Sequence, residues 1–527
     1  MSTSTPCPRC TPSADIDDAN RQPAGVGRRG PRVSDVAVAW RPAVRIALLA
    51  AVLALLWLGL RGIWDPDEGR YTNVALHMLE SGDWLNPRRS DEVGHWTKPP
   101  LTYWAIAASV AVLGESAFAG RLPAALAYLF CVWLAWRSAK RLAPGAEATA
   151  ALVYATMLLT FGASQLITTD HLLAAWTGLA MWAFIEARFG RPAHARRWIA
   201  LMWAAFALAF LTKGPPGLMP LLVIVAFDRL MPGATSHRLL DAAGIGLFLL
   251  LAAPWYLAVI HGNPGLLRYF IADEVVNRVT TNEFGRHGEW YGWLQVYAPT
   301  LLVGTLPWTP LLWRWTKTLP ASLRRWRDPR VRASEARWLL PALWLLLPLL
   351  VFGLSRSRMP LYLLPLFLPI ALLVSQQRQR EGHGLPDWRW IALWAVLLLG
   401  LKLASAAWPT HKDASAWAAE IRARVPGRIE EVVFVEDMAR YGLHIELGAT
   451  VEKLSLDPEP DAPRFNPDND ADLAQELAER ERNVVWITKQ AEFAAVQARI
   501  ETFGYRVREL GTPYQRRVIF LVEPAAR

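Results

Sequence analysis

The 527-residue chain contains only three cysteines, and only 19% of its residues are charged. Cys7, Cys10 and Cys131 are too few for a disulfide framework, and the CxxC spacing of Cys7 and Cys10 lacks the second pair that a closed zinc site needs. The low charge, with 53% hydrophobic residues and 27 tryptophans, excludes an ordinary soluble enzyme. This composition is typical of an integral membrane protein whose indole rings lie at the lipid headgroup level.

The sequence also lacks a Walker-type glycine-rich loop, a nucleotide fingerprint and internal repeats. A cytoplasmic nucleotide is therefore not expected as a direct group donor, whereas a lipid-linked phosphate is within reach of a membrane protein. The net charge of +10 is concentrated in short loops between apolar runs. That distribution is an orientation signal, and it predicts no nucleic-acid partner.

Long apolar runs recur from residues 44–60 to residues 390–408 and predict a polytopic α-helical membrane protein with 11–13 transmembrane helices. Arginines before the first run place the N-terminus in the cytoplasm. If the run at 99–113 lies in the outer interface without crossing, every later basic cluster also falls inside. The chain is thus expected to be a multi-pass protein of the bacterial inner (cytoplasmic) membrane.

The pattern divides the chain into three parts. Residues 1–42 mix polar residues, proline and arginine without an apolar period and predict a disordered cytoplasmic tail. Residues 43–408 form the transmembrane part. In residues 409–527, strand-like runs such as 432–435 and 517–522 alternate with helical patterns, which predicts a small soluble α/β domain. Counting the predicted crossings from the cytoplasmic N-terminus places this domain, and the C-terminus, on the periplasmic side.

Titratable residues that the orientation rule does not explain gather on the same outer face. The first group follows the first apolar run, where Asp67, Glu68 and Arg70 lie at the membrane surface. A carboxylate there can take a proton from an acceptor hydroxyl, although Asp67 and Glu68 could also simply cap a helix. The other candidates are two lysines and a second acid. Lys98 is followed by two prolines, Lys213 is followed by Gly-Pro-Pro, and Asp170 lies at the outer end of an apolar run.

Arg356 and Arg358 violate the positive-inside rule, because both occupy a short outer loop. A bound anion explains the violation, since guanidinium groups grip phosphate oxygens, with Tyr362 as an added donor. Arg278 and Arg286, in a long polar loop, are further candidates for substrate binding. His287 in the same loop is a candidate ligand for a divalent metal ion, the only cofactor considered, although hydrogen bonding is the favoured role.

These motifs resemble, in matching order over residues 44–375, the GT-C membrane glycosyltransferases related to protein O-mannosyltransferases. The resemblance is greatest to bacterial lipid A 4-amino-4-deoxy-L-arabinose (aminoarabinose) transferases. The segments that carry it include Asp67-Glu68-Gly69-Arg70-Tyr71, Lys98-Pro99-Pro100, Thr169-Asp170, Leu211 to Pro215, and Ser355 to Tyr362.

The resemblance implies an inverting transfer of a sugar from a polyprenyl phosphate, typically undecaprenyl phosphate, to a periplasmic acceptor. Asp67 would be the essential acid of the first loop and Asp170 the second acid, with Glu68 in a supporting role. Lys98, Arg358 and Tyr362 match positions associated with the lipid phosphate. Aminoarabinose transferases commonly carry a glutamate, associated with a metal, where this chain has Thr97.

Three readings of function remain open. The first is aminoarabinose transfer to lipid A, with polyprenyl-phosphate sugar, lipid A and membrane lipids as partners. The second is a transferase of the same fold with another sugar, or with a protein or glycan acceptor. The third, from another class, is a transporter or flippase of polyprenyl-linked substrates, for which internal repeats would be expected.

Overall fold

The computed structural model describes residues 33–233, 238–277, 287–459, 464–479 and 483–525. Internal contacts divide the chain into residues 1–44 and residues 45–527, and the second group forms one compact unit. Cys7, Cys10 and most of the predicted tail lie outside the described residues. The first helix, α1 (Val33–Leu55), spans the division. The boundaries expected at residues 42 and 408 stay a prediction.

Helices account for the described chain up to residue 407. They are α2 (Asp67–Ser81), α3 (Leu101–Leu113), α4 (Ala117–Leu142), α5 (Glu147–Thr156), α6 (Leu158–Ala163), α7 (Asp170–Phe189), η1 (Pro192–His194), α8 (Ala195–Lys213), η2 (Pro215–Leu218), α9 (Met219–Leu230), α10 (Ala242–Gly262), α11 (Leu266–Ile271), the π-helical η3 (Ala272–Asn277), α13 (Gly292–Gly304), α14 (Thr309–Arg325), α15 (Pro329–Ser334), α16 (Ala336–Leu354), η4 (Pro360–Leu366), α17 (Phe367–Arg380) and α18 (Trp388–Ala407).

Six helical segments among the described residues are long and apolar enough to cross a membrane: 117–142, 192–213, 242–262, 336–354, 360–380 and 388–407. The predicted class, a polytopic α-helical membrane protein, is confirmed. The predicted number of 11–13 spans stays a prediction, because shorter helices do not meet that length. With 13 residues, α3 is only about 20 Å long against a hydrocarbon core of about 30 Å. Because α9 and α13 are about as short, this length does not test the expectation that the run at 99–113 does not cross, which stays a prediction.

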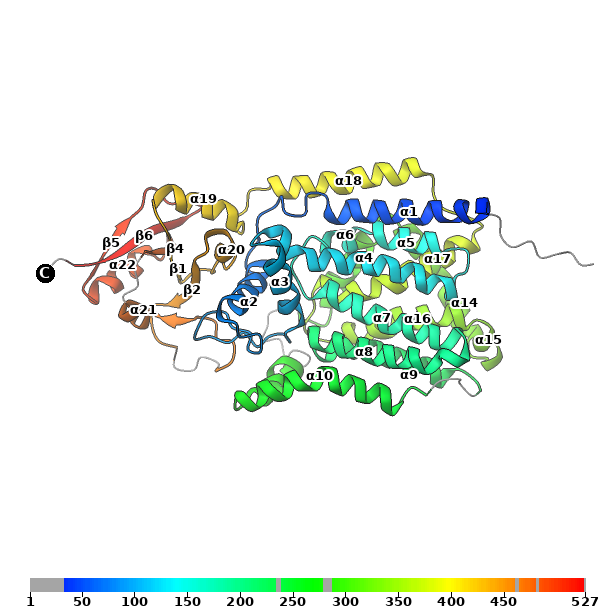
Figure 1. The fold of residues 1–527 in the computed structure, drawn as a ribbon. Coiled ribbons are helices and arrows are strands. Elements are labelled where there is room, and N and C mark those ends of the chain that lie inside the picture. The colour runs from blue at the N-terminus through cyan, green and yellow to red at the C-terminus, as the bar shows by residue number, and fades with distance from the viewer. Residues whose placement is uncertain (1–32, 234–237, 278–286, 460–463, 480–482, 526–527) are drawn as a thin grey trace, which may run out of the picture. The chain divides into compact units, whose positions relative to one another are not determined.

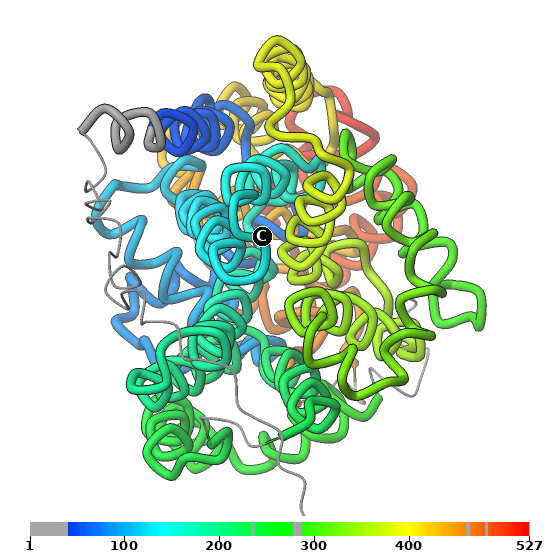
Figure 2. The backbone as a smooth tube through the Cα atoms, turned by 90° about the vertical axis from the view of Figure 1, so that its right-hand side faces the viewer, coloured from blue at the N-terminus to red at the C-terminus, as the bar shows by residue number. Residues whose placement is uncertain are grey.

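Small residues let the central helices approach closely. Ala174, Ala175 and Gly178 of α7 are buried, and a methyl group added at Gly178 would press against Leu134 and Leu368. This is the packing expected in lipid, where small residues at helix interfaces allow close van der Waals contact. Figure 2 views these helices end-on, with the turns of α4, α7 and α8 beside one another.

The basic ends of the helices meet at one end of the bundle. Arg141 pairs with Glu186 (2.8 Å), Arg314 pairs with Glu381 (3.3 Å), and Arg332 donates to the Leu230 carbonyl (2.8 Å). These contacts join α4 to α7, α14 to the end of α17, and α15 to the end of α9. Arginines from the predicted basic clusters thus contact the end of a neighbouring helix, and the side of the membrane that they face stays a prediction.

The chain after residue 409 forms a six-stranded sheet with strand order β3-β2-β1-β4-β6-β5. The first four of these strands are parallel, whereas β6 is antiparallel to both β4 and β5. This region confirms the predicted small α/β domain. Its elements are α19 (Ala414–Arg424), β1 (Glu431–Val435), α20 (Leu443–Leu447), β2 (Thr450–Ser455), β3 (Ala471–Asp472), α21 (Leu473–Glu479), β4 (Val484–Lys489), α22 (Phe493–Thr502), β5 (Tyr505–Glu509) and β6 (Arg517–Pro524).

Alternating side chains of the sheet enter two separate cores. Val432 and Phe434 of β1 belong to a core shared with Trp417 of α19 and Leu76 of α2, whereas Val433 and its neighbours pack against α22. The first core therefore joins the C-terminal sheet to the helix that begins at Asp67. In Figure 1, α2 and α3 lie between the sheet and the long helices.

Candidate functional site

A cavity of about 470 Å³ opens where α8, α10, α16 and η4 meet the loop before α3. Its walls are mostly apolar, with Phe210, Tyr256 and Trp344 among them. Lys98, Lys213 and Tyr362, three predicted site residues from distant parts of the sequence, line it together. An apolar wall with a few cationic and hydroxyl groups suits a ligand that has a long hydrocarbon tail and an anionic head.

Lys213 links two of the predicted residues. It ends α8, and its Nζ lies 2.5 Å from Oδ1 of Asp170, the first residue of α7. Each charge lies at the helix end where the helix dipole favours it. The same Nζ lies 4.6 Å from the centre of the Tyr362 ring. The ion pair and the ring contact fix the ammonium group at the cavity wall, because both side chains of the pair are largely buried.

Lys98 comes to the lining from the loop before α3. Its Nζ donates to the Thr97 carbonyl (2.5 Å) and lies 3.6 Å from Oε2 of Glu274, which also lines the cavity. Thr97 Oγ1 lies 2.9 Å from Nε2 of His95. Burial, and then the charges of Arg70, Arg89 and Lys98, hold the pKa of His95 well below its ordinary value. His95 is therefore neutral at pH 7.

Asp67 begins α2 at the edge of this region. Its carboxylate is 61% exposed and pairs with Arg70 at 2.7 Å. The ring of Tyr71, which follows Arg70 in the motif, packs tilted against that of Tyr103 in α3, with the ring centres 5.6 Å apart. Burial raises the pKa of Tyr71, and the charges of Asp170 and Asp67 raise it further against the opposing effect of Arg70. The two predicted acids thus act on the same phenol group from α7 and α2.

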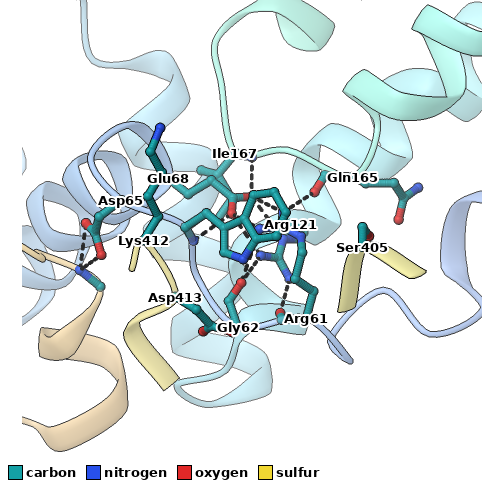
Figure 3. Close-up of polar contacts among 12 residues, drawn as sticks. Arg61, Gly62, Asp65, Glu68, Arg121, Gln165, Ile167, Ser405, Lys412 and Asp413 are labelled. Carbon is teal, nitrogen blue, oxygen red and sulfur yellow. Dashed lines mark hydrogen bonds and ion pairs between the residues drawn. The ribbon is translucent and has the colours of Figure 1, made fainter. Parts of the chain in front are cut away.

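Glu68 has a different environment from Asp67. Its buried carboxylate accepts hydrogen bonds from Arg61 (2.7 and 2.9 Å), from Arg121 of α4 (2.9 and 3.0 Å) and from the backbone N–H groups of Trp64 and Ile167. Figure 3 shows both arginines converging on this carboxylate. Burial alone would raise the pKa of Glu68, but Arg121 and Arg61 outweigh it and lower the pKa to about 2.

This geometry favours the supporting role for Glu68 over proton transfer. Six hydrogen bonds occupy its two oxygens, and a carboxylate with so low a pKa does not exchange a proton near neutral pH. The group instead joins the loop before α2, the first turns of α4 and the segment before α7. It thereby fixes the helix end that presents Asp67.

The predicted arginines of the 355–362 loop do not line the cavity. Arg358 is buried, and it donates to the backbone carbonyls of His287, Glu289 (2.7 Å) and Gly353 (3.1 Å). In this geometry it ties the start of α13 to the end of α16. Arg356 is exposed. Arg278 and Arg286 lie outside the described residues.

His287 is exposed and has a backbone φ of 54°, and it does not meet other metal-ligating side chains in the described parts of the chain. Residues 278–286, which precede it, lie outside the described residues, so the metal role of His287 stays a prediction. Within the described residues, Glu431, Glu452 and Glu476 form a group whose oxygens lie within 4.8 Å of one another. This group belongs to the C-terminal sheet, away from the cavity lining.

Sequence reasoning left several residues of this region without a role. Glu274 was one polar residue in a polar loop, and only the structure brings it to Lys98. His95 and Tyr103 likewise meet Thr97 and Tyr71 through folding. The signal that could have found Tyr71 is its place inside the motif that begins at Asp67.

Comparison with known proteins agrees with this arrangement. Residues 97–257 match the family described as dolichyl-phosphate-mannose-protein mannosyltransferase. The crystal structure of ArnT from Cupriavidus metallidurans bound to undecaprenyl phosphate has the same fold, with a TM-score of 0.71 and 21% identity, over 92% of this chain and 98% of that one. The chain therefore has the fold of that structure, and the match to the mannosyltransferase family agrees with the resemblance found in the sequence.

More specific similarity is to undecaprenyl phosphate-alpha-4-amino-4-deoxy-L-arabinose arabinosyl transferases. The chain is 34% identical over 353 residues to one from Pseudomonas fluorescens, covering 64% of this chain and 59% of that protein. It is 34% identical over 365 residues to one from Pseudomonas aeruginosa, covering 66% and 61%. The matched region thus spans about three fifths of the length of these relatives.

Proposed function

We propose that this chain is an inverting glycosyltransferase of the bacterial inner membrane. It moves 4-amino-4-deoxy-L-arabinose from undecaprenyl phosphate to lipid A. The observation that carries the proposal is the cavity, in which an apolar wall meets Lys98, Lys213 and Tyr362. This combination suits a polyprenyl chain ending in a phosphate, and the similar arabinosyl transferases are named for such a donor.

The proposed reaction assigns roles to groups on two sides of the sugar. An acceptor oxygen on lipid A attacks the anomeric carbon, and the bond from that carbon to the phosphate oxygen breaks. Asp67 takes up or orients the acceptor proton. Lys98 and Tyr362 stabilise the negative charge that remains on the departing undecaprenyl phosphate, and Lys213 adds to the local positive charge.

The orientation of the protein follows the same proposal. The cavity and the C-terminal domain face the periplasm, where lipid A is reached, and the gathered arginines of the opposite end face the cytoplasm. Support comes from the contacts that join those arginines, such as Arg141 with Glu186 and Arg314 with Glu381. Arg70, Arg356 and Arg358 then act by positioning loops, or contact the acceptor, and not by direct grip of the lipid phosphate inside the cavity.

The test is a transfer assay with purified protein in lipid vesicles that contain lipid A. Labelled undecaprenyl-phosphate aminoarabinose is added, and lipid A is analysed by mass spectrometry. The proposal expects lipid A to gain one aminoarabinose residue. Movement of the donor across the bilayer without any glycosylated product would contradict it and favour a transporter. Transfer to protein or another glycan alone would refute the lipid A assignment.

A further inference from the structure

The C-terminal domain contacts the loop that leads to Lys98 through a buried ion pair. Nε of Arg89 lies 2.7 Å from Oδ1 of Asp470, and the two side chains are 6% and 1% exposed. Nη2 of Arg89 also donates to the Pro467 carbonyl (3.0 Å). Segments more than 370 residues apart in the sequence are thereby joined at a site from which water is excluded.

Asp470 is held on its own side by the sheet domain. Its Oδ2 accepts hydrogen bonds from the backbone N–H of Lys453 in β2 (2.8 Å) and from the hydroxyl of Tyr441 (3.2 Å). The guanidinium group of Arg89 lies over the ring of the same tyrosine, 5.8 Å from its centre. These contacts within the domain fix the position of the Asp470 carboxylate independently of Arg89. The geometry of the ion pair is therefore restricted.

The loop that carries Arg89 is compact. The Arg89 N–H donates to the Val93 carbonyl (2.8 Å), the His95 N–H donates to the Pro87 carbonyl (2.7 Å), and Asn73 of α2 donates to the Arg89 carbonyl (2.6 Å). After His95 the chain goes directly to Trp96, Thr97 and Lys98, all of which line the cavity. Fixing Arg89 therefore limits where Lys98 can be.

We propose that the C-terminal domain is a positioning element for the cavity, and that the Arg89–Asp470 pair holds the 87–95 loop so that the Lys98 ammonium meets the phosphate of a polyprenyl phosphate. The pair does not touch the ligand and acts through the loop. This inference rests on the proposed function for the identity of the ligand, but the anchoring of the loop does not depend on it.

The experiment uses the full-length protein with Asp470→Asn. The amide keeps acceptor capacity for Lys453 and Tyr441 but removes the charge that pairs with Arg89. Two quantities are measured: hydrogen–deuterium exchange of the backbone from 87 to 98, and the Kd for undecaprenyl phosphate. We expect both to increase by at least about tenfold, because breaking a buried pair leaves an uncompensated charge. In the transfer assay, KM for the donor should rise more than kcat falls.

The matched control is Asp437→Asn. Asp437 is also 1% exposed in the C-terminal domain and pairs with Arg440 and Arg517 of the same domain. The Asp437→Asn variant should leave the loop exchange and the Kd close to their wild-type values. Equal effects of the two variants would mean general loss of domain stability and would overturn the proposal, as would faster loop exchange with an unchanged Kd, or no change in exchange.

If Asp470→Asn does not fold, Tyr441→Phe removes only one donor to Asp470. It should then change the same two quantities by roughly twofold to tenfold, and no change in either would overturn the proposal. If the wild-type protein binds no undecaprenyl phosphate, the proposed function fails. Loop exchange in Asp470→Asn then decides by itself whether the domain anchors the loop.

Discussion

At the scale of single residues, Glu68 shows that a place beside a candidate catalytic acid does not by itself indicate a catalytic role. It adjoins the candidate acid Asp67, yet it neutralises two buried arginines. We expect Glu68→Gln to lower the free energy of unfolding by about 3–5 kcal/mol, because Arg61 and Arg121 lose their shared counter-charge. Thermal unfolding in detergent at pH 7 measures the effect. Glu92→Gln, at an exposed position, is the control and should unfold like wild type.

The pKa of Glu68 also sets a pH dependence. Because that pKa is lowered from 4.5 to about 2, its stabilisation is complete above about pH 4.5 and is lost as the pH falls toward 2. Wild-type protein should therefore lose stability over this interval, and Glu68→Gln should lack that part of the loss. Parallel curves for the two proteins between pH 5 and pH 3 would contradict the structural role.

At the scale of elements, the ends of α7 and α8 are joined by Asp170 and Lys213. Lys213→Met should weaken donor binding about tenfold or more, because it removes a cavity charge and leaves buried Asp170 without its ion-pair partner. Titration with undecaprenyl phosphate measures the change. Lys140→Met, an exposed lysine near the end of α4, serves as the control. Equal Kd values for Lys213→Met and wild type would exclude Lys213 from the binding site.

At the scale of the whole compact unit, residues 45–527, the sheet domain and the first loop meet at a close backbone contact. Asp65 accepts from the Gly442 N–H at 3.2 Å, and a methyl group at Gly442 would lie 2.7–2.9 Å from Ala414, Ile63 and Asp65. Gly442→Ala should therefore loosen the domain and speed proteolysis between residues 408 and 430. Gly384→Ala, where an added methyl meets open space, is the control. Unchanged proteolysis of Gly442→Ala would show that the contact tolerates the methyl group.

The features that could be predicted from the sequence are those that depend on local patterns of residues. Apolar runs predicted the helical membrane class, and alternation predicted the sheet after residue 430. Lys98, Lys213 and Tyr362 were expected on one face because each lies at an end of an apolar run on the predicted outer side, and they do line one cavity. The roles assigned to these residues stay predictions.

Contacts between side chains that are far apart in the sequence could not be predicted from the sequence. Nothing local indicates that Arg358 donates to carbonyls near residue 288, that Glu274 reaches Lys98, or that Arg89 finds Asp470. Such contacts depend on how helices and loops pack, because oppositely charged residues are numerous and only tertiary structure selects the pairs. Arg358, which was expected at a phosphate, joins the segment before α13 to the end of α16, and its role at a phosphate stays a prediction.

The central claim is that Asp67 serves sugar transfer from a polyprenyl phosphate. Its most direct test is the initial rate of aminoarabinose transfer to lipid A by Asp67→Asn in the vesicle assay. The carboxylate is 61% exposed, so its exposed ion pair with Arg70 adds little stability and folding should be unaffected. We predict a rate lower by a factor of about 10² to 10⁴, the usual contribution of a general base, with an unchanged unfolding temperature. Transfer at the wild-type rate by Asp67→Asn would contradict the account.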